Sequence, residues 1–170
     1  MLNLIIGGAG SGKSAYAESL TLRLPGRRVY LATMQSRDAE SLKRIERHRV
    51  QRAPHGFLTV ECPTDLAGTQ FPENANILLE DLSNLLANEM FSQEGGGAEA
   101  VRRGLESLLS RCANLTVVTN EVFSGGADYA PETLAYMKEL ALLNRELAAK
   151  SDFCAELVCG LPHILKGEEP

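Results

Sequence analysis

Short apolar runs alternate with longer amphipathic or charged stretches along this chain of 170 residues. The apolar runs have the length and composition of buried strands, and they cover residues 2–6, 28–33, 57–60, 76–80, 115–120 and 156–159. The stretches between them predict helices over residues 14–20, 37–51, 81–91, 98–112 and 131–150. Strands that alternate with helices predict an α/β fold, with a mostly parallel sheet and helices on both of its faces.

The polar residues that follow these strands are the first candidates for a functional site. In open parallel sheets, ligands bind beyond the carboxyl ends of the strands. Internal repeats and long linkers are both absent from the sequence, so we expect residues 1–170 to form one domain. The polar segments that would meet at this edge of the sheet are residues 7–14, 33–35, 61, 80–81 and 119–121.

The segment from Gly7 to Ser14 matches the phosphate-binding loop pattern G-x-x-x-x-G-K-[ST] in full. It lies between a predicted strand and a predicted helix, where such a loop has to be. Its glycines allow backbone N–H groups to surround an anion, and the helix N-terminus adds partial positive charge. We expect Lys13 to reach the β- and γ-phosphates of a nucleotide and the Ser14 hydroxyl to bind Mg²⁺.

Two further segments at the same edge carry polar chemistry. Glu80 and Asp81 end an apolar strand, so one of them is a candidate for binding Mg²⁺ and the other for capping the next helix. Asp81 is the natural cap. Residues 119–121, Thr-Asn-Glu, either position a substrate or a metal-bound water, or form a polar turn.

A basic segment over residues 43–52 contains His48 among several cations. If the segment is helical, Arg44, His48 and Arg52 share one face, because they are four residues apart. Neighbouring cations favour the neutral form of the His48 imidazole, which is the nucleophilic form. The same cations would also bind a triphosphate. A solvated basic face and a nucleic-acid patch are the alternative interpretations, the second weakened by the lack of nearby aromatic residues.

Composition narrows the choice of function and compartment. The net charge of −5 argues against a dedicated nucleic-acid-binding protein. The apolar runs are too short to span a membrane, and the N-terminus has no signal-peptide pattern. Four cysteines follow no metal-binding spacing, and Cys154 and Cys159 are expected to be buried thiols. These features predict a cytoplasmic protein.

Several segments taken together resemble one known family. They are IIGGAGSGKSAYAE, VYLATM, RIERHRVQR, FLTVE, ILLED, NLLAN, VTNEV and LVCGLPHILKG, in this order from residue 5 to residue 167. In this order and at these intervals, the chain resembles the bifunctional adenosylcobinamide kinase / adenosylcobinamide-phosphate guanylyltransferases of cobalamin biosynthesis. It departs from the usual family pattern at Gly10, where the phosphate loop more often carries Arg.

The resemblance implies a RecA-like P-loop fold, a homotrimer and two reactions. ATP or GTP would phosphorylate adenosylcobinamide, and GTP would then guanylylate His48, from which GMP passes to the phosphorylated corrinoid. It implies catalytic roles for His48 and Lys13 and a Mg²⁺ site at Ser14 and Glu80. The nucleotide contacts that it implies are Gly7, Gly8, Ala9, Gly10, Ser11, Gly12, Lys13, Ser14, Thr33, Met34, Gln35, Arg49, Val50, Gln51, Arg52, Glu61 and Glu80.

Two other functions remain open from the residues alone. A kinase for a small molecule would use only the phosphate loop and would not need His48. A RecA-like nucleotide-binding module would instead bind nucleic acid or a protein through the basic face over residues 44–52. The net charge of −5 and the lack of nearby aromatic residues make the binding module the weakest of the three interpretations.

Overall fold

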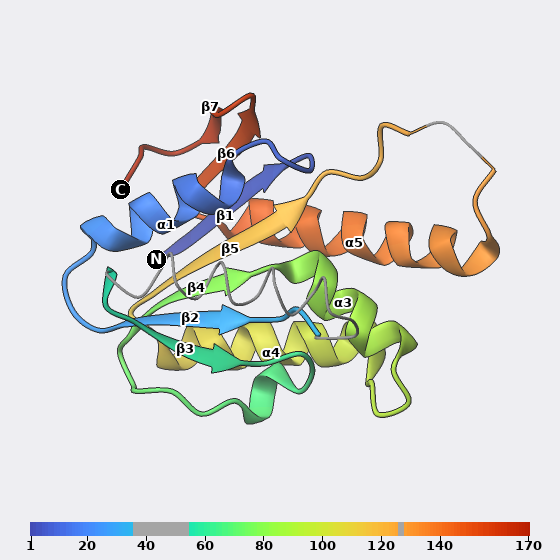
Figure 1. Ribbon diagram of the computed structural model, residues 1–170, viewed down its shortest axis with the longest axis horizontal. Helices are drawn as coiled ribbons and strands as arrows, with labels where there is room; N and C mark the ends of the chain where they lie inside the picture. Colours follow the sequence, from blue (N-terminus) through green and yellow to red (C-terminus); the bar gives the residue numbers. More distant parts are fainter. Residues whose placement is uncertain (36–54, 126–127) are drawn as a thin grey trace.

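A computed structural model describes residues 1–35, 55–125 and 128–170. Its seven strands form one sheet in the order β3-β2-β4-β5-β1-β6-β7 (Figure 1). All neighbouring strands are parallel except β6 and β7, which form an antiparallel hairpin at one edge. The strands are β1 Leu2–Gly7, β2 Arg28–Ala32, β3 Phe57–Glu61, β4 Asn76–Glu80, β5 Asn114–Asn120, β6 Phe153–Val158 and β7 Leu161–Lys166. The prediction of a mostly parallel α/β sheet is therefore confirmed.

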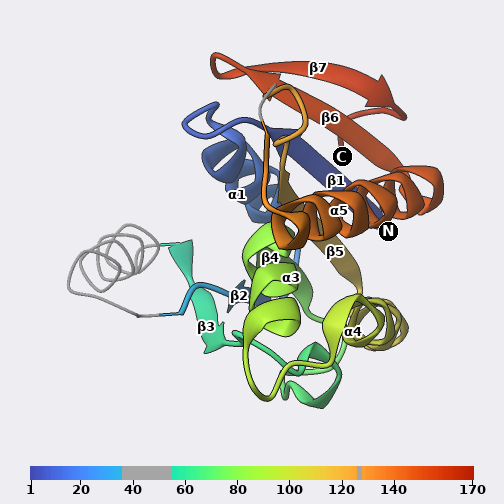
Figure 2. The ribbon, with the colours of Figure 1, turned by 90° about the vertical axis from the view of Figure 1, so that its right-hand side faces the viewer.

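Helices cover both faces of the sheet, as the sequence predicted. Figure 2 shows α1 on one face and α3, α4 and α5 on the other. The helices are α1 Lys13–Arg23, α3 Leu82–Phe91, α4 Gly97–Arg111 and α5 Pro131–Lys150, with a short 3-10 turn at Leu66–Gly68. The helix predicted over residues 37–51 lies outside the described residues.

Alternation along the strands divides the core into two layers. In β1, Leu4 packs into the layer formed with α3, α4 and α5, and its neighbour Ile5 packs into the layer that contains α1. Both side chains are almost fully buried. A strand whose successive side chains are buried on opposite faces is mostly apolar, which is why β1 and β4 read as near-continuous apolar runs.

The C-terminal edge differs from the sequence prediction. β6 begins at Phe153, three residues earlier than expected, and it ends at Val158. The strand β7 was not predicted, and all of its residues are exposed. Cys159 lies in the turn between these strands and is exposed, so its prediction as a buried thiol is wrong; Cys154 is buried as expected.

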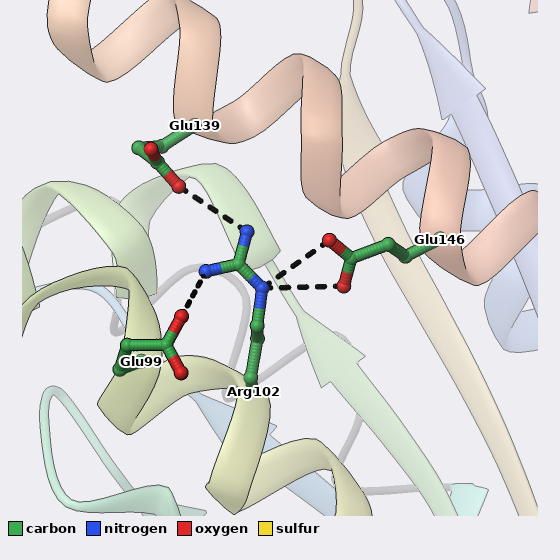
Figure 3. A network of polar contacts seen from close by, with 4 residues as sticks. All are labelled: Glu99, Arg102, Glu139 and Glu146. Carbon is green, nitrogen blue, oxygen red and sulfur yellow. Dashed lines mark hydrogen bonds and ion pairs between the residues drawn. The ribbon is translucent and has the colours of Figure 1, made fainter.

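An ion-pair network joins α4 to α5 (Figure 3). Arg102 of α4 binds Glu99 on its own helix at 2.6 Å, and Glu139 and Glu146 of α5, each at 3.2 Å. Hydrogen bonding to Glu146, the largest cause, raises the pKa of Arg102, with smaller contributions from Glu139 and Glu99. A second polar contact ties α5 to α3: the Tyr136 hydroxyl of α5 donates to the Ser83 carbonyl at 3.0 Å.

Within the described ranges, the helices lack the combination of length and apolar character that crossing a membrane requires.

Candidate active site

The phosphate loop connects β1 to α1 and curves back on itself. The backbone N–H of Ser11 donates to the Gly8 carbonyl at 3.3 Å, and Lys13 Nζ donates to the same oxygen at 3.0 Å. Gly10 and Gly12 have φ angles of 70° and 92°, a region that other residues rarely adopt. Gly12 is also the N-cap of α1 and has no side chain to bind the amides of the first helical turn. Those amides therefore remain available to an anion.

Backbone hydrogen bonds join neighbouring strands where they end, and one of these bonds is made to the phosphate loop. The N–H of Glu121, just after β5, donates to the Gly7 carbonyl at 3.0 Å. The N–H of Thr33, just after β2, donates to the Glu80 carbonyl at 3.1 Å. The carboxyl ends of four neighbouring strands, β2, β4, β5 and β1, are thus tied together at one edge of the sheet.

A cleft of about 660 Å³ lies at this edge. It is large enough for a ligand the size of a nucleotide. Its walls combine the phosphate loop with polar side chains from the ends of β4 and β5. The lining residues are Ala9, Gly10, Ser11, Gly12, Lys13, Ser14, Ala15, Met34, Glu80, Asp81, Asn84, Asn120, Glu121 and Val122.

Asp81 organises the wall opposite the phosphate loop. It is the N-cap of α3, and its Oδ1 accepts from the Asn84 N–H at 2.7 Å and from the Ser83 hydroxyl at 2.6 Å. Its Oδ2 accepts from the side-chain amides of Asn84 at 3.1 Å and Asn120 at 3.4 Å. The prediction of Asp81 as a helix cap is confirmed, and its carboxylate is already committed to these donors.

Thr33 is fully buried behind that wall and does not line the cleft. Its hydroxyl donates to the Asp81 carbonyl at 2.9 Å and accepts from the Asp81 N–H at 2.7 Å. Its own carbonyl accepts from the Asn88 side chain at 2.8 Å. Its contacts therefore place Thr33 as a link between β2 and the start of α3.

The predicted nucleotide contacts divide into residues that line the cleft, residues that do not, and residues outside the described ranges. Among those that the structure describes, residues 9–14, Met34 and Glu80 line the cleft, whereas Gly7, Gly8, Thr33, Gln35 and Glu61 do not. Glu61 is exposed at the end of β3, where it and Glu80 flank Ala32 on neighbouring strands. His48 and the predicted contacts Arg49, Val50, Gln51 and Arg52 lie outside the described residues.

The cleft offers oxygen donors suited to Mg²⁺. Ser14 and Glu80, which the sequence predicts as metal ligands, both line it. No group of three or more His, Cys, Asp or Glu residues that could bind a metal occurs within residues 1–35, 55–125 and 128–170. Magnesium in nucleotide sites keeps several waters and binds phosphate oxygens, so two protein oxygens fit this ion.

Residues that the sequence reasoning missed also contribute to the cleft. Asn84 lines it and binds Asp81 through both its backbone and its side chain. The sequence signal that could have identified Asn84 is its position three residues after the predicted N-cap Asp81. Tyr136 stabilises the same wall through Ser83, and burial, followed by the charge of Asp81, raises the pKa of Tyr136 to about 12.

Comparison with known proteins agrees with the sequence resemblance. The sequence model of the cobinamide kinase / cobinamide phosphate guanyltransferase family matches residues 3–165. The bifunctional adenosylcobalamin biosynthesis protein CobP of Pseudomonas aeruginosa is 35% identical, over 99% of each chain. The bifunctional adenosylcobalamin biosynthesis proteins CobU of Escherichia coli and Salmonella typhimurium are both 31% identical, over 95% of this chain and 97% of their own.

Proposed function

Because this chain belongs to the cobinamide kinase / cobinamide phosphate guanyltransferase family, we propose that the cleft at its phosphate loop serves two successive reactions. The chain is an enzyme of cobalamin biosynthesis, both a kinase and a guanylyltransferase. In the first reaction, ATP or GTP phosphorylates adenosylcobinamide. In the second, GMP from GTP passes to adenosylcobinamide phosphate and gives adenosylcobinamide-GDP. The observation that carries the proposal is a family match over nearly the whole chain, with an intact phosphate loop lining the cleft.

The phosphate loop has the parts that phosphoryl transfer needs. Transfer of this kind depends mainly on positioning and on neutralising charge. Lys13 is only 8% exposed, and its ammonium is held over the loop by the Gly8 carbonyl, close to where the β- and γ-phosphates would lie. The amides of the first turn of α1 would bind phosphate oxygens. Ser14 and Glu80 would hold Mg²⁺, which supplies positive charge to the phosphates when it is bound.

The guanylyl transfer requires a nucleophile, and we assign this role to His48. A ring nitrogen of His48 attacks the α-phosphorus of GTP, so that an N–P bond forms, the bond to the bridging oxygen breaks and pyrophosphate leaves. A phosphate oxygen of adenosylcobinamide phosphate then attacks the same phosphorus, and the N–P bond breaks. Two easier transfers thereby replace one difficult transfer. Arg49 and Arg52 would stabilise the charge that develops on the phosphoryl oxygens.

The family resemblance also supports a homotrimer, and the sequence pattern supports a cytoplasmic location. The substrates are small molecules: a nucleotide and a corrinoid. Nucleic acid has no place in this function, consistent with the net charge of −5.

Product analysis with a matched pair of variants tests the two reactions together. Wild-type protein, adenosylcobinamide, GTP and Mg²⁺ should yield adenosylcobinamide phosphate and then adenosylcobinamide-GDP, identified by mass spectrometry. Lys13→Ala should form neither product, whereas His48→Ala should accumulate adenosylcobinamide phosphate. Formation of the GDP product by His48→Ala would contradict the assigned nucleophile. A wild type that makes only the phosphate would reduce the function to that of a kinase.

A further inference from the structure

The turn between β6 and β7 contacts the phosphate loop directly. The backbone N–H of Gly160 donates to the Ser11 carbonyl at 2.8 Å. The strands β6 and β7 form a hairpin at the sheet edge next to β1 (Figure 1). Leu157 of β6 pairs with Gly7 of β1. The C-terminal hairpin is therefore a structural neighbour of the loop, although the two are about 150 positions apart in the sequence.

The two backbones approach each other closely at two glycines of the phosphate loop. A Cβ atom at Gly12 would lie 3.2 Å from Gly160 Cα, and one at Gly7 would lie 2.8 Å from the Leu157 carbonyl oxygen. Gly160 itself has a φ of 82°. Two glycines of the phosphate loop thus lie against the hairpin.

The hydrogen bond from Gly160 fixes the orientation of one peptide group of the loop. The Ser11 carbonyl belongs to the Ser11–Gly12 peptide, and in a trans peptide the C=O and N–H groups point in opposite directions. A donor that holds the Ser11 carbonyl toward the hairpin therefore directs the Gly12 N–H away from it. Residues 11 and 12 line the cleft, so the hairpin contacts the phosphate loop at residues that would meet the phosphates.

We propose that Gly160 is a positioning residue for the phosphate loop, and that nucleotide binding strengthens its contact with Ser11. An anion on the Gly12 N–H polarises the peptide and makes the Ser11 oxygen a better acceptor. This inference rests on the proposed function only in requiring that the loop binds a nucleotide. It needs neither the corrinoid nor His48.

Two glycine substitutions with similar backbone strain test the proposal. Gly160→Ala places a Cβ where no atom lies within 4 Å, so it acts only through the positive φ. Gly26→Ala is the matched control, because Gly26 has a φ of 105°, its Cβ would meet only Asn76 Nδ2 at 3.8 Å, and it lies in the turn between α1 and β2. Gly160→Asn is the conservative variant, since asparagine tolerates this region of φ better than alanine.

We expect Gly160→Ala to raise the Kd for GTP with Mg²⁺ by about 5- to 10-fold in calorimetric titration, because alanine is strained at a φ of 82° and relieves the strain by moving the residue 160 N–H away from the Ser11 carbonyl. Gly26→Ala should lower the urea midpoint but leave the Kd unchanged, and Gly160→Asn should bind GTP within about 2-fold of wild type. Equal affinities of Gly160→Ala and wild type for GTP would overturn this inference but not the proposed function. A wild type that does not bind GTP would overturn the proposed function as well.

Cys159 offers a second readout that a purely structural role would not move. It is exposed and adjacent to Gly160, whereas Cys62 and Cys154 are buried. In wild type and in Gly26→Ala, saturating GTP with Mg²⁺ should slow the alkylation of Cys159. Peptide mass spectrometry measures this alkylation. At saturating GTP this protection should be smaller in Gly160→Ala. Equal protection in Gly160→Ala and wild type would contradict coupling between the loop and the hairpin.

Discussion

Lys13 is the residue on which both proposed reactions depend. It is almost completely buried, and the Gly8 carbonyl holds its ammonium at 3.0 Å. We expect Lys13→Met to lower kcat/KM of the kinase and of the guanylyltransferase by at least about 100-fold, since a positioned charge on a transferring phosphoryl group contributes this much. Lys13→Arg should not restore activity, because a planar guanidinium does not fit a site built for a compact ammonium.

Steady-state kinetics of both half reactions, with thermal unfolding as the control for folding, measure this effect. A variant at Lys13 that lost one reaction and kept the other would show that the two reactions use different phosphate sites.

Tyr136 gives the site a pH-dependent contribution to stability. Its pKa is raised to about 12 from the ordinary 10.0, so the unfolded chain loses this proton at a lower pH than the folded protein. The contribution is therefore complete below pH 10 and is lost as pH rises toward 12. We expect Tyr136→Phe to lower stability by about 1 kcal/mol at pH 8, through loss of the hydrogen bond to Ser83.

Urea unfolding of both proteins at pH 8, 10 and 11 checks the sign. The stability advantage of wild type over Tyr136→Phe should shrink as pH rises above 10. An advantage that stays constant or grows would contradict the raised pKa.

Single residues differed in how far the sequence could predict them. Asp81 was predicted as the cap of α3 because aspartate is among the preferred residues directly before a helix, and its hydrogen bonds confirm this. Cys159 was wrongly expected to be buried, because the turn that exposes it depends on its partner strand rather than on its apolar neighbours. The roles of His48, Glu61 and Glu80 remain predictions, because composition and spacing indicate which chemistry a side chain can perform but not what the side chain contacts.

At the scale of elements, Arg102 connects α4 to α5 (Figure 3). Its side chain is 22% exposed and meets three carboxylates. We expect Arg102→Met to destabilise the protein by about 1 kcal/mol, because it leaves three acidic groups close together without a cation. The effect should shrink when NaCl is raised to about 1 M, where screening weakens their repulsion.

Urea unfolding at low and high salt measures this change. Arg103→Met on the next position of the same helix is the control, and we expect it to have little effect at either salt concentration. A loss at Arg102 that does not depend on salt would assign the effect to packing instead of charge.

Elements with a buried face were predictable, and an element without one was not. The strands β2 and β4 and the helix α5 lie where the apolar patterns predicted them. The strand β7 carries no alternation of buried and exposed residues, since all of its residues are exposed and it contains Pro162. Proline is tolerated on an edge strand, and pairing with β6 rather than burial creates this strand.

For the whole molecule, the alternation of strands and helices predicted a parallel sheet with its ligand site at the carboxyl edge. The structure places the phosphate loop, Glu80 and Asn120 together at that edge. The order of the strands could not be predicted, because the crossovers that place β1 between β5 and β6 leave no signal in the apolar pattern. The contact between Gly160 and Ser11 could not be predicted from the sequence for the same reason.

Nucleotide binding should stabilise the whole fold, because the cleft is formed from strands across the sheet. At a GTP concentration of about 100 times its Kd, we expect about 2.7 kcal/mol of added stability. Thermal unfolding with and without GTP and Mg²⁺ measures the shift, and Lys13→Met is the matched control. An unchanged melting temperature in wild type would contradict a nucleotide site in this cleft.

In the proposed mechanism, a guanylylated His48 links GTP to the corrinoid. The most direct measurement is incubation with GTP labelled at the α-phosphate in the presence of Mg²⁺, followed by acid and alkali treatment of the protein. We expect label on wild-type protein that survives alkali, is lost in acid and is absent from His48→Ala. Wild-type protein that binds GTP but retains no covalent label, or His48→Ala that is labelled like wild type, would contradict the account.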